Sequence, residues 1–189
     1  MFGIIEISKT VHSETLKSGS RSNKRLKIAH DMIASDILEK CLKKDEIVIR
    51  RLSEDERFSH EEEVPYGVKS KKKVDFAIFK KGKLVFTGGT KFIENSYNKN
   101  SNNYCESEFS QAALLSKNTP YFSITTIPKI VPIDGSFEVA KHNELYLDIE
   151  AIPNVLLCCA YIDNFEKIDY NYGKSYEELI SKIAEVLNE

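Results

Sequence analysis

The sequence predicts an α/β (α+β) domain in which helices flank a mixed central β-sheet. Two observations predict this class: helical patterns alternate with short β-rich runs along the chain, and one run, Val155 to Ile162, is apolar throughout. A continuous apolar run of this length is typical of a strand that is covered on both faces. The chain has 189 residues, the size of one domain, and we expect residues 1–189 to form a single unit.

The first elements are an arm, a helix and a strand. Residues 1–22 are polar and irregular after a short apolar start, which predicts an N-terminal arm. Residues 23–43 have helical spacing, with caps available in Ser22 and Asn23. The apolar stripe of this helix consists of Leu26, Ala29, Ile33 and Ile37. A β-branched run at 47–49 predicts a strand, and the acidic stretch 53–63 predicts an exposed loop.

Two β-rich runs follow in the middle of the chain. Residues 74–79 and 83–87 are joined by a glycine-containing link of hairpin length, which predicts two antiparallel neighbouring strands. Residues 91–103 are rich in Asn and Ser and predict a loop. Residues 104–117 return to helical spacing, and Pro120 ends that helix. The buried side of the helix is expected to contain Cys105, Phe109, Ala112 and Ser116.

The last third of the chain predicts three strands and a helix. The strands are expected at 121–127, 145–149 and 155–162. The closing helix spans 175–187 and begins with a capping box, in which Ser175 stands three residues before Glu178.

Composition and charge exclude several classes of protein. Hydrophobic residues make up 41% of the chain and charged residues 30%, with a net charge of -2, which excludes a disordered chain or a uniformly basic one. No apolar run approaches the length of a membrane helix, and no signal-peptide pattern opens the chain. The four cysteines and four histidines lack metal-ligand spacing. We therefore expect reduced thiols in a cytoplasmic protein without a membrane partner.

Asp75 and Lys91 are the strongest candidates for chemistry. Asp75 stands at the start of the first strand of the predicted hairpin, and Lys91 follows the second strand. Because a hairpin turns the chain back on itself, the two side chains are expected to share one site. The alternative is an ion pair at the rim of the sheet, which has no catalytic role and contributes little to the stability of the fold.

Val74-Asp75 and Gly89-Thr90-Lys91 resemble the core motif of the PD-(D/E)xK nuclease superfamily. In that superfamily carboxylates hold Mg²⁺, and the Lys orients the attacking water or the scissile phosphate. The order of elements and the length of the chain look most like a type II restriction endonuclease, which implies a restriction-endonuclease-like fold. Asp75 is then the first metal ligand, and Lys91 is the catalytic lysine.

Gly89 departs from the family pattern, because it stands where the superfamily usually has its second carboxylate. Some restriction enzymes that the chain resembles take this carboxylate from the next helix, where Glu106 and Glu108 are available. Helical periodicity places the two on opposite flanks of the buried face and does not choose between them. We favour Glu106 as catalytic residue and metal ligand, because its offset from Lys91 is closer to the family's and the absent side chain at Gly89 would leave room for it.

Basic and amide-rich segments flank the motif and are candidates for DNA binding. The basic residues lead into the strand of Asp75 and could contact phosphates, and the amide-rich residues follow Lys91 and could contact bases or phosphates. A solvated face and an ordinary polar loop are the alternatives. The candidates are Lys69, Lys71, Lys72, Lys73, Asn95, Asn98, Lys99, Asn100, Asn102 and Asn103.

The resemblance implies a Mg²⁺-dependent type II restriction endonuclease that hydrolyses phosphodiester bonds in duplex DNA at a specific short sequence. It also implies a homodimer, because a palindromic site has a two-fold axis. Two alternatives stay open. A nuclease-like domain that binds DNA or protein without cutting would follow if Gly89 marks a lost site. A structure-specific nuclease of the same fold would recognise shape instead of sequence.

Overall fold

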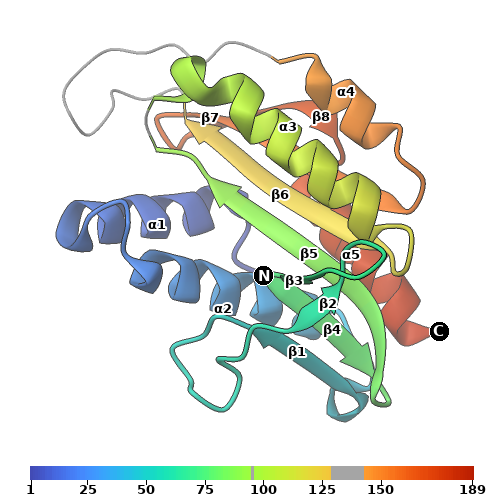
Figure 1. Cartoon of the computed structure of the whole chain (residues 1–189). Coiled ribbons are helices and arrows are strands. Elements are labelled where there is room, and N and C mark those ends of the chain that lie inside the picture. The colour runs from blue at the N-terminus through green and yellow to red at the C-terminus, as the bar shows by residue number, and fades with distance from the viewer. Residues whose placement is uncertain (95, 129–142) are drawn as a thin grey trace.

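A six-stranded mixed sheet runs through the computed structural model, which describes residues 1–94, 96–128 and 143–189 (Figure 1). The strand order is β1-β4-β5-β6-β7-β8. The strands are β1 (Ile47–Arg51), β4 (Phe76–Lys80), β5 (Lys83–Phe92), β6 (Tyr121–Pro128), β7 (Val155–Asp163) and β8 (Lys167–Gly173). β6 is parallel to β5 and β7, and the outer pairs are antiparallel. The predicted mixed sheet flanked by helices is confirmed.

Helices cover both faces of the sheet (Figure 1). α1 (Ile4–Ser18), α2 (Asn23–Glu39) and α5 (Tyr176–Asn188) bury their apolar residues in one core cluster, and α3 (Tyr97–Leu115) and α4 (Leu145–Glu150) contribute to a second. Side chains alternate along β7, so Cys158 belongs to the first cluster and Cys159 to the second. This explains why β7 is apolar throughout.

The predicted N-terminal arm is wrong, because residues 4–18 form α1, which packs on α2. Ile4, Ile7 and Val11 are buried at helical spacing. The buried side also contains polar residues, including Glu14 and Thr15, which obscure the pattern in the sequence. Thr15 satisfies its hydroxyl locally by donating to the carbonyl oxygen of Val11 at 2.8 Å.

Three further segments differ from the prediction. Residues 97–103 belong to α3, because the buried Tyr97 fixes the first turn of this helix despite its Asn-rich composition. Residues 145–149 form the helix α4 instead of a strand, and a short apolar run does not distinguish the two. β8 was not predicted, because its sequence Lys167–Gly173 is mostly polar and pairs as an edge strand.

The predicted hairpin and the predicted capping box are confirmed. The hairpin is present as β4 and β5, and the capping box opens α5, with Ser175 and Glu178 each bonded to the other's backbone N–H. All four cysteines are free and buried. None of the helices in the described ranges combines the length and apolar character that crossing a membrane requires.

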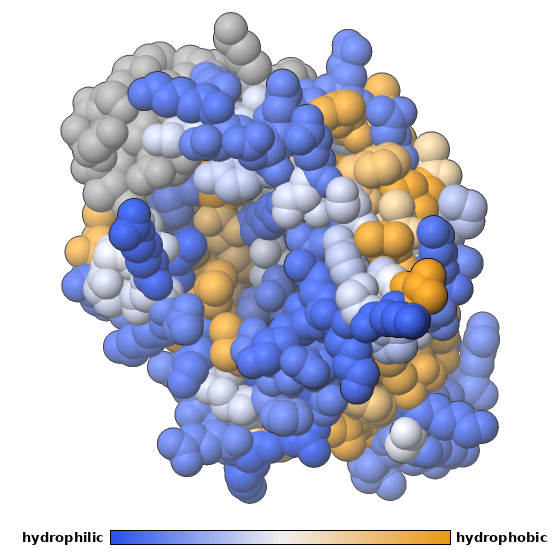
Figure 2. Space-filling view, viewed as in Figure 1, coloured by the Kyte–Doolittle hydropathy of each residue, from blue (hydrophilic) through white to orange (hydrophobic). Residues whose placement is uncertain are grey.

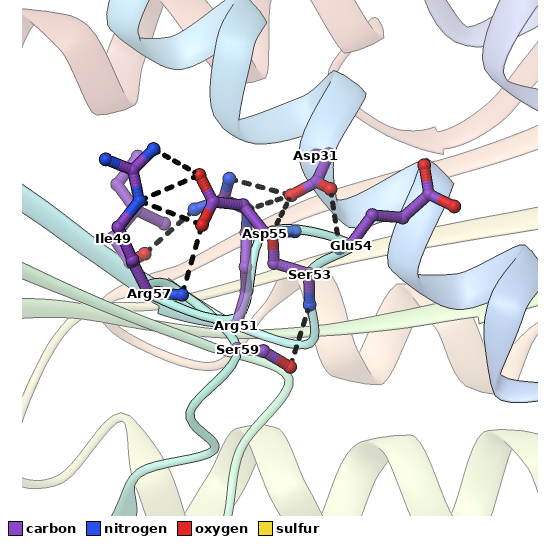
Figure 3. Close-up of polar contacts among 8 residues, drawn as sticks. All are labelled: Asp31, Ile49, Arg51, Ser53, Glu54, Asp55, Arg57 and Ser59. Atoms are coloured by element: carbon purple, nitrogen blue, oxygen red, sulfur yellow. Dashed lines mark hydrogen bonds and ion pairs between the residues drawn. The ribbon is translucent and has the colours of Figure 1, made fainter.

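Two small additions lie outside the six-stranded sheet. The short strands β2 (Glu63–Pro65) and β3 (Lys71–Lys73) pair with each other, and a 3-10 turn, η1 (Lys44–Glu46), precedes β1. The acidic loop after β1 is anchored to α2 (Figure 3). Asp31 accepts hydrogen bonds from Arg51 Nε at 2.8 Å and Ser53 Oγ at 2.6 Å. This anchor fixes the loop that leads to β2 and β3.

Candidate active site

Asp75 and Lys91 lie at the same end of the hairpin, as predicted. Phe76 pairs with Gly88, so Asp75 lies beside the C-terminal part of β5. Its Oδ2 accepts hydrogen bonds from the backbone N–H of Thr90 at 2.7 Å and from Thr90 Oγ1 at 3.2 Å. Asp75 and Lys91 line a pocket of about 230 Å³, together with Glu108.

Glu108 enters the pocket, whereas Glu106 does not. Glu106 is exposed and lines a different depression, next to Phe109 and Leu145. The preference for Glu106 is therefore corrected to Glu108. The buried face of α3 follows Cys105, Glu108, Ala112 and Leu115, and Phe109 is 40% exposed. Helical periodicity misplaced the face because it assigned the apolar Phe109 to the core and the charged residue to the flank.

Two hydroxyls of β6 hold the Glu108 carboxylate. Thr125 Oγ1 lies 2.9 Å from both of its oxygens, and the hydroxyl of Ser123 donates to Oε1. In the parallel pairing, Ser123 and Thr125 are the partners of Gly89 and Lys91. The strand register therefore places Glu108 beside the motif of the hairpin.

Glu108 is 1% exposed, and this burial raises the pKa of its carboxyl above the ordinary value of 4.5, while the Lys91 ammonium and the two hydroxyls oppose the shift. A pKa that is higher in the folded chain than in the unfolded one stabilises the fold below the unfolded pKa. That contribution is lost as the pH rises through the folded pKa.

We therefore expect Glu108→Gln to gain stability relative to the parent chain as the pH rises from 4 to 8 in EDTA. Each unit by which the pKa in the folded chain exceeds that in the unfolded chain changes the free energy of unfolding by about 1.4 kcal/mol across this pH range. Urea unfolding at a series of pH values measures the difference. Glu106→Gln, on the exposed side of the same helix, is the control, and a pH-independent difference for Glu108→Gln would contradict the expectation.

Lys91 is held by the helix that follows it. Its Nζ donates to the backbone carbonyl oxygen of Tyr104 at 2.7 Å. The same Nζ lies 5.8 Å from the centre of the Tyr104 aromatic ring. Burial lowers the pKa of the Lys91 ammonium, and the carboxylates of Glu108 and Asp75 oppose this shift. A half-buried ammonium near two carboxylates is a donor for a phosphate oxygen or a water.

His30 is a residue of this region that the sequence analysis missed. It is fully buried on α2, and its Nε2 lies 2.8 Å from Thr90 Oγ1. Because Thr90 donates its only hydroxyl proton to Asp75, His30 must donate to Thr90 through Nε2. Burial lowers the pKa of His30 to about 4, so the ring is neutral at pH 7. A histidine next to the apolar stripe of the predicted helix was the only signal in the sequence.

Gly89 lies directly against the side chain of Tyr121. A Cβ atom at position 89 would overlap the hydroxyl oxygen of Tyr121, whose side chain is 1% exposed. The space that the missing side chain leaves is therefore occupied by Tyr121, and it does not receive a glutamate as we had expected. The second carboxylate of the pocket comes from the expected helix, α3, but it is that of Glu108.

The pocket contains two carboxylates, Asp75 and Glu108. The described parts of the chain contain no group of three or more His, Cys, Asp or Glu side chains that could hold a metal ion. Mg²⁺ is usually held in proteins by one or two carboxylates together with substrate phosphates and waters. The residues present therefore fit a magnesium ion that binds together with a phosphate-containing substrate.

The four candidate lysines lie before and within β3. Lys72 and Lys73 line the pocket of Asp75. Lys72 Nζ lies 5.3 Å from the centre of the Tyr66 ring, and Lys73 Nζ lies 3.6 Å from a Glu61 carboxylate oxygen. Lys69 and Lys71 are exposed outside this pocket. The structure therefore brings two of the four to the site.

The amide-rich candidates occupy the first turns of α3 instead of a loop. Lys99, Asn102 and Asn103 are exposed, and Asn98 and Asn100 are half-buried. Asn95 lies outside the described residues. Asn100 donates to the carbonyl oxygen of Ser96 at 3.1 Å, a local contact within the helix start. Asn103 lines a second pocket, which shares Thr90 and Lys91 with the first.

Comparisons of the chain with protein-family models, with curated proteins and with solved structures gave no match.

Proposed function

We propose that the chain is a Mg²⁺-dependent endodeoxyribonuclease of the type II restriction class, which hydrolyses phosphodiester bonds in duplex DNA at a short specific sequence. One observation carries the proposal: Asp75, Lys91 and Glu108, from the hairpin and from α3, line one pocket together with Lys72 and Lys73. Two carboxylates, a half-buried ammonium and neighbouring lysines suit a metal ion and a phosphodiester.

Asp75 and Glu108 would hold the magnesium ion. When bound, Mg²⁺ supplies positive charge that neutralises the phosphate oxygens. Thr90 fixes the carboxylate of Asp75 and is itself fixed by His30. Lys91 donates to a phosphate oxygen or orients the attacking water, and its partial burial reduces the screening of this donor by solvent.

The proposal includes a homodimer that acts in the cytoplasm. A palindromic site has a two-fold axis, and two identical subunits related by the same axis are the economical way to cut both strands.

Incubation with a long, defined duplex DNA in Mg²⁺ tests the proposed function. We expect discrete fragments that are absent in EDTA and with Asp75→Ala. Asp45→Ala is the matched control. Asp45 is an exposed acid in η1, just before the start of β1, and this end of β1 is the one farther from Asp75. Intact DNA after incubation with the parent chain in Mg²⁺ would contradict the proposal.

The fit of Gly89 to Tyr121 favours a second candidate, a nuclease-like domain that binds duplex DNA without cutting it. Retained binding to duplex DNA without cleavage in Mg²⁺ would select this candidate. Fragments at branch points of a junction substrate, without sequence-specific cutting of linear DNA, would indicate a structure-specific nuclease.

A further inference from the structure

A larger pocket adjoins the candidate active site. It has a volume of about 610 Å³, and it lies between the start of α2, the C-terminal end of β5 and one face of α3. Thr90 and Lys91 line both pockets. On the face shown in Figure 2, mainly hydrophilic residues surround a hollow. A ligand in the larger pocket would therefore touch the site of Asp75 and Glu108.

Arg25 is the main charged donor of this pocket. Its Nη1 donates to the carbonyl oxygen of Phe92 at 3.2 Å, and its Nε is buried without a hydrogen-bond partner within the described residues. Burial lowers the pKa of Arg25, but a guanidinium stays charged at neutral pH. The Glu94 carboxylate opposes this shift, and a half-buried guanidinium that lines a pocket can donate to the oxygens of an anionic ligand there.

The other wall residues suit a nucleotide. Tyr104 supplies an aromatic ring, and Asn103 and Ser107 supply polar groups. The acidic member, Glu94, is engaged by His12, whose Nδ1 lies 2.6 Å from its carboxylate. The volume exceeds what a phosphate group needs and lies within the range of about 300–1,000 Å³ that is usual for small-molecule sites.

We propose that this pocket binds the nucleotide next to the scissile phosphate, with Arg25 donating to its phosphate group and Asn103, Tyr104 and Ser107 contacting the sugar or base. The inference rests on the proposed function, and it identifies the residues that position the DNA strand. Arg25 is a positioning residue in this role, and its conformation is fixed by its bond to Phe92.

Binding of a fluorescein-labelled duplex in EDTA tests the inference separately from cleavage. Arg25→Ala removes the donor, and Ser107→Trp fills the pocket from an exposed helix position while Arg25 itself is kept. We expect the Kd to rise by at least about tenfold in both variants, equivalent to about 1.4 kcal/mol. Lys43→Ala is the control, because it removes one exposed cation just before η1, away from the pocket. Its Kd should stay within about twofold. Thermal unfolding identifies any variant that fails to fold.

The outcomes separate the inference from the proposed function. If the parent chain cleaves DNA and folded Ser107→Trp binds as tightly as the parent, the inference is wrong and the proposed function stands. If the parent binds without cleaving and both variants lose binding, the pocket binds a nucleotide of the duplex, and the proposed nuclease activity is wrong. Displacement of the labelled duplex by excess unlabelled duplex supports the assignment to DNA. Displacement by a free deoxynucleoside monophosphate at the same nucleotide concentration would overturn that assignment.

Discussion

Glu108→Gln should lower Mg²⁺-dependent cleavage of duplex DNA by at least about a hundredfold, because loss of a ligand is expected to exceed the 10- to 100-fold cost of losing one of its supporting partners. Gln keeps the size of the side chain and can still accept hydrogen bonds from Ser123 and Thr125. The substitution removes the negative charge and replaces one carboxylate oxygen by an amide NH₂ group. Initial cleavage rates at saturating Mg²⁺ and at limiting Mg²⁺ measure the loss.

Glu106→Gln provides the matched control, since it removes the same charge two residues earlier on α3. Glu106 is exposed and lies outside the pocket of Asp75, so its cleavage rate should stay within about twofold of the parent. A larger loss for Glu106→Gln than for Glu108→Gln would overturn the assignment and restore our first choice of residue.

Gly89→Ala should destabilise the fold by about 1–3 kcal/mol, the usual cost of adding a methyl group where there is no room. The added Cβ would overlap the Tyr121 hydroxyl, whereas the ring carbon that bears this hydroxyl is 3.4 Å away. Removing the hydroxyl should therefore relieve the overlap. Replacing Gly89 with the acid that the nuclease superfamily usually has here should meet the same obstacle.

A double-mutant cycle measures this effect. The free energies of unfolding of Gly89→Ala, Tyr121→Phe and the double variant are compared with that of the parent chain in urea. The cost of Gly89→Ala should be smaller in the Tyr121→Phe background than in the parent. Equal costs in both backgrounds would show that Tyr121 does not exclude a side chain at this position.

The hairpin motif was predictable because its residues are close in sequence. Strand patterns on both sides of a glycine-containing link fix the direction of the chain, and Asp75 and Lys91 then lie at one end. Glu108 was harder to predict, because it reaches the pocket through the pairing of β5 with β6 and through Ser123 and Thr125. That pairing is a long-range property of the fold.

Helix α1 and the first turns of α3 were missed for the same reason, because long-range contacts decide their conformation. Propensity and apolar spacing are weak where tertiary contacts decide the conformation. In α1 a buried face includes Glu14 and Thr15, and in α3 the Asn-rich start is held by Tyr97. His30 was overlooked because a fully buried imidazole has no distinctive spacing in the sequence.

The two adjacent thiols of β7 give the chain a built-in probe of its internal motions. Cys158 lies in the cluster under α1, α2 and α5, and Cys159 lies in the cluster under α3 and α4. Burial raises the pKa of both thiols, so neither reacts readily in the closed protein. An alkylating reagent would therefore modify each thiol only when its own layer opens. The ratio of the two modification rates would show whether the helices over the candidate site detach independently of the opposite layer.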